Sequence, residues 1–323
     1  MAAHGGKVVI YAALAGNTLI AITKFAAAFY TGSSAMLSEG IHSLVDTGNQ
    51  GLLLYGMKRA SRPPDERYPF GHGPELYFWS FVVAIMIFAV GAGVSIYEGI
   101  EKLRHPHPVA NPFVNYVVLG LAMIFEGAAW YVAWKAFNTK RGKLGFFEAV
   151  RDSKDPTVFT VLFEDTAAML GLVVAAIGIG LAQWLDQPWL DGAASVAIGL
   201  ILALTAWLLG VETKGLLIGE AAAPEVVRGI RRIVGKSDAV DRLNEIRTMH
   251  QGPSDVLLAI SIDFKNNLKV GRVEQAVYEM EMAIKEKFPE IRRVFIEAQA
   301  ARHHERILEQ EIAEHGPPGN AET

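Results

Sequence analysis

Long apolar runs fill the first two thirds of the chain. Four of them come close to the roughly 20 residues that an α-helix needs to cross a hydrocarbon core about 30 Å thick. Three of these runs contain no charged residue, and the fourth contains only Glu126. The pattern predicts membrane-spanning helices at residues 76–97, 114–134, 166–185 and 192–211.

Two earlier runs are apolar but are interrupted by polar residues. Residues 8–30 contain Asn17 and Lys24, and residues 35–55 contain Glu39, His42 and Asp46. A cleaved signal peptide does not explain the first run, because its lysine lies deep inside the apolar region. We therefore expect a domain of six transmembrane helices over residues 1–216.

Basic residues gather in alternate loops between these helices. One loop carries Lys58, Arg59, Arg62 and Arg67, and another carries Lys135, Lys140, Arg141, Lys143, Arg151 and Lys154. The loops between them carry only Lys102 and Arg104. Because short cytoplasmic loops are enriched in Lys and Arg, we expect both termini in the cytoplasm and the chain in the plasma (inner) membrane.

The composition changes after residue 216, where no long apolar run remains. Leu258, Ile260 and Ile262 alternate with small or polar residues, which is the period of a half-buried strand. Apolar residues at helical spacing occur both before and after this strand, which predicts two helices. Two further strands complete the order αββαβ. The sequence predicts a cytoplasmic α+β (ferredoxin-like) domain at 217–300, and a polar tail at 301–323 that we expect to fray.

Composition narrows the chemistry. The formal net charge of -4 argues against a nucleic-acid partner, which would need a basic face to neutralise phosphate. The chain contains no cysteine, which excludes disulfides and thiolate ligands. A metal site must therefore use His, Asp and Glu.

Two groups of ionisable residues lie within the apolar runs, where a charge is costly to bury and usually marks a substrate path or a pair. His42 and Asp46 are four residues apart, so they share one face of a helix, as two metal ligands do. Glu164 and Asp165 are adjacent at the start of the fifth predicted helix. The alternatives are a His–Asp pair that serves packing, and an acidic pair favoured by a helix N-terminus.

The whole arrangement resembles the cation diffusion facilitator family of divalent metal/proton antiporters, in its zinc-transporter-nine-like branch. The resemblance rests on the six spans, the α+β domain, residues 32–35 (Gly-Ser-Ser-Ala), the His42/Asp46 pair and residues 68–75 (Tyr-Pro-Phe-Gly-His-Gly-Pro-Glu). It implies a transporter and not an enzyme. It also implies a homodimer that exports Zn²⁺ or a related ion in exchange for protons, with a tetrahedral site between the second and fifth spans.

The resemblance places the ligands of this transport site on His42, Asp46 and Asp165. The family's histidine in the fifth span falls on Val161, which cannot bind metal; a register shifted by one would use Glu164 and Thr160 instead. The fourth ligand is therefore Glu164, our first choice, or Asn17, or water, with Gln50 as a weaker candidate. Such an oxygen-rich site shifts preference from Zn²⁺ toward Mn²⁺, Fe²⁺ or Co²⁺, and Cd²⁺ is a further candidate.

The resemblance implies two other metal sites, both incomplete here. In the loop before the third span, Asp65 and His72 match the family, but Tyr68 takes the place of a middle histidine. In the α+β domain the family's ligand positions fall on Asn244, Ser261, Glu297 and Gln299, of which only Glu297 is a good ligand. We expect the loop to have a structural role at least as readily as a metal site, and the domain to serve dimerisation.

Three further features carry expectations. Lys24 either neutralises an acid or reaches an interface with its long side chain, and we favour the second because it costs less than burying the charge. Glu126 is either a proton relay or the partner of Lys24. Gly91, Ser95 and Gly99 form a stripe of small residues that predicts close helix packing.

Other classes of function remain to be weighed against transport. A metal-sensing membrane scaffold that does not transport would share the same domains. A membrane metalloenzyme is a weaker alternative, because the chain has no HExxH helix and no Ser/His/Asp set in its spans.

Overall fold

The computed structural model describes residues 2–142, 145–146, 149–150 and 153–316. Lys143, Arg151 and residues 317–323 of the expected tail lie outside the described residues. Contacts between Cα atoms divide the chain into two compact units, Met1–Leu217 and Ile218–Thr323. Each unit is described by itself.

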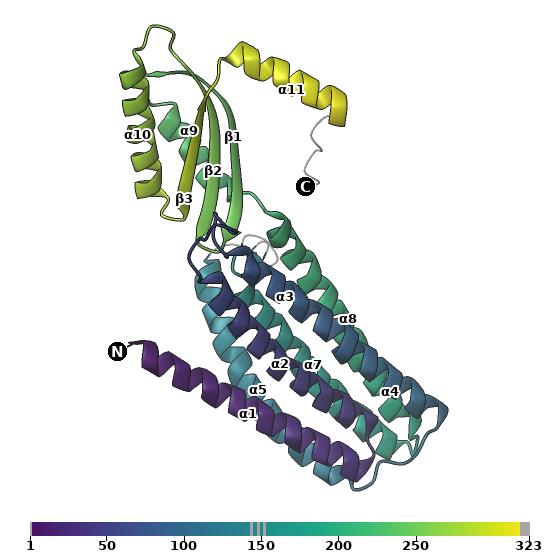
Figure 1. The fold of residues 1–323 in the computed structure, drawn as a ribbon. Coiled ribbons are helices and arrows are strands. Elements are labelled where there is room, and N and C mark those ends of the chain that lie inside the picture. The colour runs from purple at the N-terminus through teal and green to yellow at the C-terminus, as the bar shows by residue number, and fades with distance from the viewer. Residues whose placement is uncertain (1, 143–144, 147–148, 151–152, 317–323) are drawn as a thin grey trace. The chain divides into compact units, whose positions relative to one another are not determined.

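The first unit is helical (Figure 1). Its helices are α1 (Ala2–Thr31), α2 (Ser34–Ala60), α3 (Pro74–Met86), α4 (Gly93–Arg104), α5 (Pro112–Arg141), α7 (Pro156–Trp184) and α8 (Trp189–Ile218). A π-helical turn, η1 (Ile87–Ala92), joins α3 to α4, so that these three elements form one continuous rod.

Four helical rods of the described residues are long and apolar enough to cross a membrane: Pro74–Arg104, Pro112–Thr139, Phe159–Trp184 and Trp189–Ile218. Each contains one of the charge-poor runs, so the prediction of these four spans is confirmed. Helices α1 and α2 are of similar length, 30 and 27 residues, but are not among these four. Six spans therefore stay a prediction.

A buried aspartate fixes where α2 begins. Ser33 caps the helix by accepting a hydrogen bond from the Met36 backbone N–H at 3.1 Å. Asp191 of α8 is fully buried and accepts hydrogen bonds from the Ser33 hydroxyl at 2.6 Å and from the Ser34 backbone N–H at 2.7 Å. Its charge also complements the positive end of the helix dipole. The serines of the family-like segment at 32–35 thus join α2 to α8.

Small residues let α4 and α8 approach closely. A Cβ atom built on Gly99 would lie 2.7 Å from Val196 Cγ2 and from the Val196 backbone nitrogen, so only glycine fits there. The Ser195 hydroxyl donates to the Ser95 carbonyl oxygen at 2.8 Å across the same contact. The packing expected from the small-residue stripe is confirmed at Ser95 and Gly99.

The second unit is a three-stranded mixed sheet with helices (Figure 1). Its elements are α9 (Pro224–Val234), β1 (Val240–Gly252), β2 (Asp255–Phe264), α10 (Val270–Lys287), β3 (Ile291–Ala298) and α11 (Ala301–His315). The strand order is β1-β2-β3, with β1 antiparallel and β3 parallel to β2. Leu258, Ile260 and Ile262 are buried on one face of β2 with residues of α9 and α10, as their alternation predicts.

The expectation of a frayed tail is wrong for residues 301–315, which form helix α11. Asp263 at the end of β2 accepts a hydrogen bond from the Ala301 backbone N–H at 2.8 Å. This bond satisfies one of the donors that a helix N-terminus leaves free. The partner is distant in sequence, which is why the polar composition of the tail did not reveal the helix.

Replacing Asp191 should destabilise the first unit. Asp191→Ala leaves the Ser34 N–H without its acceptor and removes the carboxylate that lies 3.6 Å from the Lys102 ammonium. Because a buried charge loses its partner, we expect the free energy of unfolding to fall by about 3–5 kcal/mol. Denaturant titration in detergent micelles measures this change. Glu101→Ala, which removes an exposed acid beside Lys102, should change it by less than about 1 kcal/mol.

Candidate functional site

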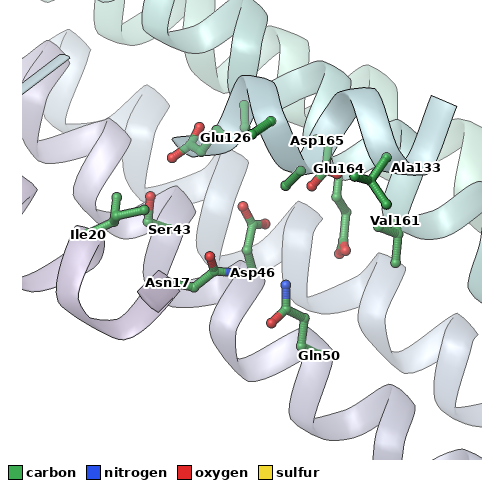
Figure 2. Close-up of a pocket in the computed structure, with 14 residues that line it drawn as sticks. Asn17, Ile20, Ser43, Asp46, Gln50, Glu126, Ala133, Val161, Glu164 and Asp165 are labelled. Atoms are coloured by element: carbon green, nitrogen blue, oxygen red, sulfur yellow. The ribbon is translucent and has the colours of Figure 1, made fainter. Parts of the chain in front are cut away.

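A cavity of about 480 Å³ opens among helices α1, α2, α5 and α7 of the first unit (Figure 2). Its walls are mostly apolar, but seven polar side chains line it: Asn17, Ser43, Asp46, Gln50, Glu126, Glu164 and Asp165. Four of these carry carboxylates. The cavity therefore concentrates negative charge inside an otherwise apolar bundle.

Helix α2 supplies one wall through a single polar face. Glu39, His42, Asp46 and Asn49 recur every three or four residues, so the helical period places them along one side. Asp46 lines the cavity, and Asn49 is buried next to it. The Asn49 side-chain amide donates a hydrogen bond to Glu164 Oε1 at 2.7 Å. This bond ties α2 to α7 at the cavity.

Helix α7 supplies the opposite wall. Glu164 and Asp165 both line the cavity, with Val161 one turn before Asp165 (Figure 2). Adjacent residues on a helix point about 100° apart, so both acids reach the space only because the cavity extends around this side of α7. Val161 stands where the resemblance places a histidine, and it offers the cavity no ligand atom.

His42 lies beside the cavity and is not among the residues that line it. Its ring is buried, with Nδ1 3.4 Å from Asp46 Oδ1 and with no hydrogen-bond partner for either nitrogen among the described residues. Over the same residues, no three His, Asp or Glu side chains converge closely enough to hold a metal ion. The structure thus gathers Asp46, Glu164 and Asp165 around one space without closing a coordination shell.

Of the two interpretations of Lys24, the structure contains neutralisation of an acid, and the favoured one, in which the side chain reaches an interface, is wrong. The ammonium group is fully buried and donates to Glu39 Oε2 at 3.0 Å, Glu126 Oε1 at 2.7 Å and Ser43 Oγ at 2.8 Å. Two carboxylates offset the cost of removing the ammonium from water. Of the two interpretations of Glu126, partnership with Lys24 is the one that the structure contains.

Glycine at position 171 makes room for this ion cluster. A Cβ atom built on Gly171 of α7 would collide with Glu39 Oε1. Any side chain there would therefore push against the buried carboxylate. Close approach of α7 to α2 depends on this glycine.

Asp65 and His72 are brought together in the loop between α2 and α3. His72 Nε2 lies 3.0 Å from Asp65 Oδ2, and the Asp65 carboxylate also accepts the backbone N–H of Tyr68 at 2.7 Å. The Tyr68 N–H, followed by the His72 ring, lowers the pKa of the Asp65 carboxyl below its ordinary value. The Tyr68 ring packs on His72 with centroids 4.6 Å apart. These contacts brace the loop internally.

The four family positions of the second unit form a polar network around Gln299. Asn244 Nδ2 donates to the Gln299 carbonyl at 2.9 Å, and Ser261 Oγ donates to Gln299 Oε1 at 3.3 Å. His304 of α11 also lies 2.9 Å from Gln299 Oε1. Glu297 shares a cavity of about 340 Å³ with Ser261, Gln299 and His304. Amide and hydroxyl groups thus bond to one another at most of these positions.

Residues 10–218 match the cation efflux transmembrane domain. The chain belongs to the cation efflux family. This confirms the resemblance: the chain is an integral, multi-pass membrane protein of a transporter family, and the family is not one of enzymes.

Relatives of two names illustrate what the chain is similar to. The chain is 36% identical over 311 residues to the proton-coupled zinc antiporter SLC30A9, mitochondrial, of Xenopus laevis. The aligned residues make up 94% of this chain and 54% of that protein. The chain is 35% identical over 262 residues to the human protein of that name, covering 80% and 46%. It is 25% identical over 288 residues to the cation-efflux pump FieF of Escherichia coli, covering 88% and 90%. The chain spans about half the length of the SLC30A9 relatives it matches.

Sequence reasoning missed two side chains of this region, Glu39 and Asn49. Both share the α2 face of Asp46, seven residues before it and three after it. That periodicity was a usable signal for each. What it does not reveal is the partner, since Lys24 and Glu164 lie on other helices.

Adding a methyl group at position 171 should disturb the ion cluster. Gly171→Ala forces the Glu39 carboxylate away from Lys24, and we expect the free energy of unfolding to fall by about 2–4 kcal/mol. Gly210→Ala is the matched control, because its Cβ would meet no described heavy atom within 4 Å. It should be neutral or stabilise by up to about 1 kcal/mol. Equal effects in SDS titrations of the two variants would contradict the role given to Gly171.

Proposed function

We propose that this chain transports a divalent cation across the membrane in exchange for protons, with Zn²⁺ as the first candidate. The observation that carries the proposal is the cavity in which Asp46 faces Glu164 and Asp165 inside an apolar helical unit. Uncompensated acids at such depth mark an ion path. The names of the SLC30A9 relatives, proton-coupled zinc antiporters, support both the ion and the coupling.

Asp46, Asp165 and Glu164 bind the cation in this proposal, and His42 joins them. Ligand bonds to Zn²⁺ are about 2.0–2.2 Å long, much shorter than the width of a 480 Å³ cavity. The cation must therefore draw α2 and α7 together before its shell closes. His42 Nδ1, already 3.4 Å from Asp46 Oδ1, needs only a small turn of α2 to share the same ion.

Proton coupling follows from the ligand chemistry. Carboxylates and imidazole bind metal only when deprotonated, so protons and the cation compete for the same lone pairs. Protons arriving from the acidic side would expel the cation there, and the protonated site would then release its protons on the other side and bind a new cation. Opening of the cavity to each side in turn, by rocking of helices, completes an antiport cycle.

Direction and assembly are further parts of the proposal. The basic loops at 58–67 and 135–154 support cytoplasmic termini, and export from the cytoplasm across the plasma (inner) membrane is proposed from the family resemblance. A homodimer is expected from the family, with the second unit as its platform. The oxygen-rich ligand set keeps Mn²⁺, Fe²⁺, Co²⁺ and Cd²⁺ as alternative substrates.

A metal-sensing scaffold that does not transport is the second candidate, since the second unit keeps a polar cavity with Glu297 and His304. The two candidates differ in one measurement. Proteoliposomes with an imposed pH gradient should accumulate Zn²⁺ and release protons if the chain transports, and neither signal should appear if it only senses.

Removing either central acid should abolish transport. Asp46→Ala and Asp165→Ala each delete a charged ligand, so we expect Zn²⁺ flux into proteoliposomes to fall by about 100-fold or more, as losses of ~3 kcal/mol imply. Folding should survive, because neither carboxylate accepts a hydrogen bond among those found for the described residues. Glu66→Gln, an exposed loop acid, is the control. Normal flux in either cavity variant would overturn the site.

The fourth ligand is decided by comparing two partners of one hydrogen bond. Glu164→Gln keeps the size of the side chain but removes its charge, so apparent Zn²⁺ affinity should fall about tenfold or more, equivalent to ~1.4 kcal/mol. Asn49→Ala keeps the Glu164 carboxylate and removes only its 2.7 Å donor, so its effect should be smaller. Should Glu164→Gln change affinity by less than about twofold, Asn17 or water takes the fourth position.

A further inference from the structure

The Lys24 ammonium sits in a shell of oxygen atoms. Glu39 Oε2, Glu126 Oε1 and Ser43 Oγ lie 3.0, 2.7 and 2.8 Å from Lys24 Nζ. The shell comes from three helices, because Lys24 belongs to α1, Glu39 and Ser43 to α2, and Glu126 to α5. It has the composition of a cation site, with two carboxylates and one hydroxyl.

Each carboxylate of the shell keeps a second oxygen. Glu39 Oε1 and Glu126 Oε2 are buried and have no hydrogen-bond partner among the described residues. Two carboxylates and a hydroxyl thus accept the three hydrogen bonds that one ammonium can donate, and two buried carboxylate oxygens are left without a donor in the part of the chain that the structure describes. The shell holds more ligand capacity than a lysine uses, whereas a purely structural ion pair gains nothing from unsatisfied buried oxygens.

The shell also adjoins the cargo cavity. Ser43 and Glu126 contribute to the shell and line the cavity that contains Asp46 and Asp165. A cation in the cavity therefore passes within reach of a second set of oxygens. Carboxylate and hydroxyl oxygens suit hard divalent ions such as Mn²⁺ and Mg²⁺.

We propose that the Lys24 ammonium is a tethered occupant of a second cation position, formed by Glu39, Glu126 and Ser43 beside the cargo cavity, and that it keeps this position closed to divalent ions. The inference rests on the proposed function for the identity of the cavity. A lysine cannot leave with the cargo, so the position stays filled through the cycle. Each turnover then carries only the cation bound at Asp46.

Charge supports this assignment. The shell sets two carboxyl groups, those of Glu39 and Glu126, against the single ammonium of Lys24. Without the ammonium, the two acids match the charge of one divalent cation. Deleting the lysine should therefore create a site where the wild-type chain has none.

The test counts bound Mn²⁺ on the purified full-length chain by equilibrium dialysis and elemental analysis. Lys24→Ala should bind about one more Mn²⁺ per chain than the wild type, because it vacates a shell of hard oxygen ligands. Lys24→Arg, which keeps the charge, should show no gain. Lys24→Ala/Glu39→Gln, which removes one carboxylate of the shell, should lose the gain.

A stability readout covers the case in which Lys24→Ala folds poorly. Millimolar Mn²⁺ or methylammonium should then raise the melting temperature of Lys24→Ala, and should not do so for the double variant. A folded Lys24→Ala that binds no extra Mn²⁺, or an unstable one that neither cation rescues, would overturn the proposal and leave the lysine a structural tie.

The proposed function is judged separately within the same assay. Asp46→Ala in the wild-type background should lower the cation count, and the gain in Lys24→Ala does not depend on that result. Loss of the gain alone contradicts the second position, whereas an unchanged count in Asp46→Ala contradicts the transport site.

Discussion

An ammonium group buried among apolar helices must find negative partners, and this requirement organises the first unit. Lys24 lies on α1, and its partners lie on α2 and α5. Because the ion pairs have one favourable geometry, they fix the rotation of α2 about its own axis. That rotation turns the α2 polar face, with Asp46 and Asn49, toward α7. The cavity exists because this face has a defined direction.

The same face of α2 supplies Asp46 to the proposed cation site and joins α2 to its neighbouring helices. Glu39 accepts a hydrogen bond from Lys24, and Asn49 donates one to Glu164. Among the acids of α2, only Asp46 faces the cavity with an oxygen that has no partner in the described part of the chain. The side-chain amide of Asn49 donates to Glu164 and so moderates the repulsion among Asp46, Glu164 and Asp165. A site that must hold a divalent ion and then release it benefits from acids that are gathered and not yet satisfied.

Much of this fold follows from the sequence, because the signals are local. Runs with one charged residue or none predicted the four confirmed spans, and the alternation at Leu258, Ile260 and Ile262 predicted the buried face of β2. The spacing of Asp46 and the Glu164–Asp165 pair indicated the acids that share one cavity. The failures share one cause, since each depends on a partner distant in sequence. Lys24 is held away from an interface by Glu39 and Glu126, which lie on other helices. Helix α11 depends on Asp263. The place of His42 outside the lining of the cavity depends on how α2 is rotated.

The π-helical turn at Ile87–Ala92 gives one rod two independent faces. A π turn holds one residue more than an α turn, so it rotates everything beyond it by about 100° relative to an unbroken α-helix. Before the turn, Trp79 packs against Gly56 of α2, and after it, Gly99 packs against Val196 of α8. Residues 79 and 99 are 20 positions apart, so they would point about 200° apart on an unbroken α-helix, and the π turn changes this angle by about 100°. The wider turn thus sets a fixed rotation between the two ends of the rod, so that each end can pack on a different neighbour. A residue gained or lost within the turn would rotate one end away from its neighbour while the other end kept its contacts.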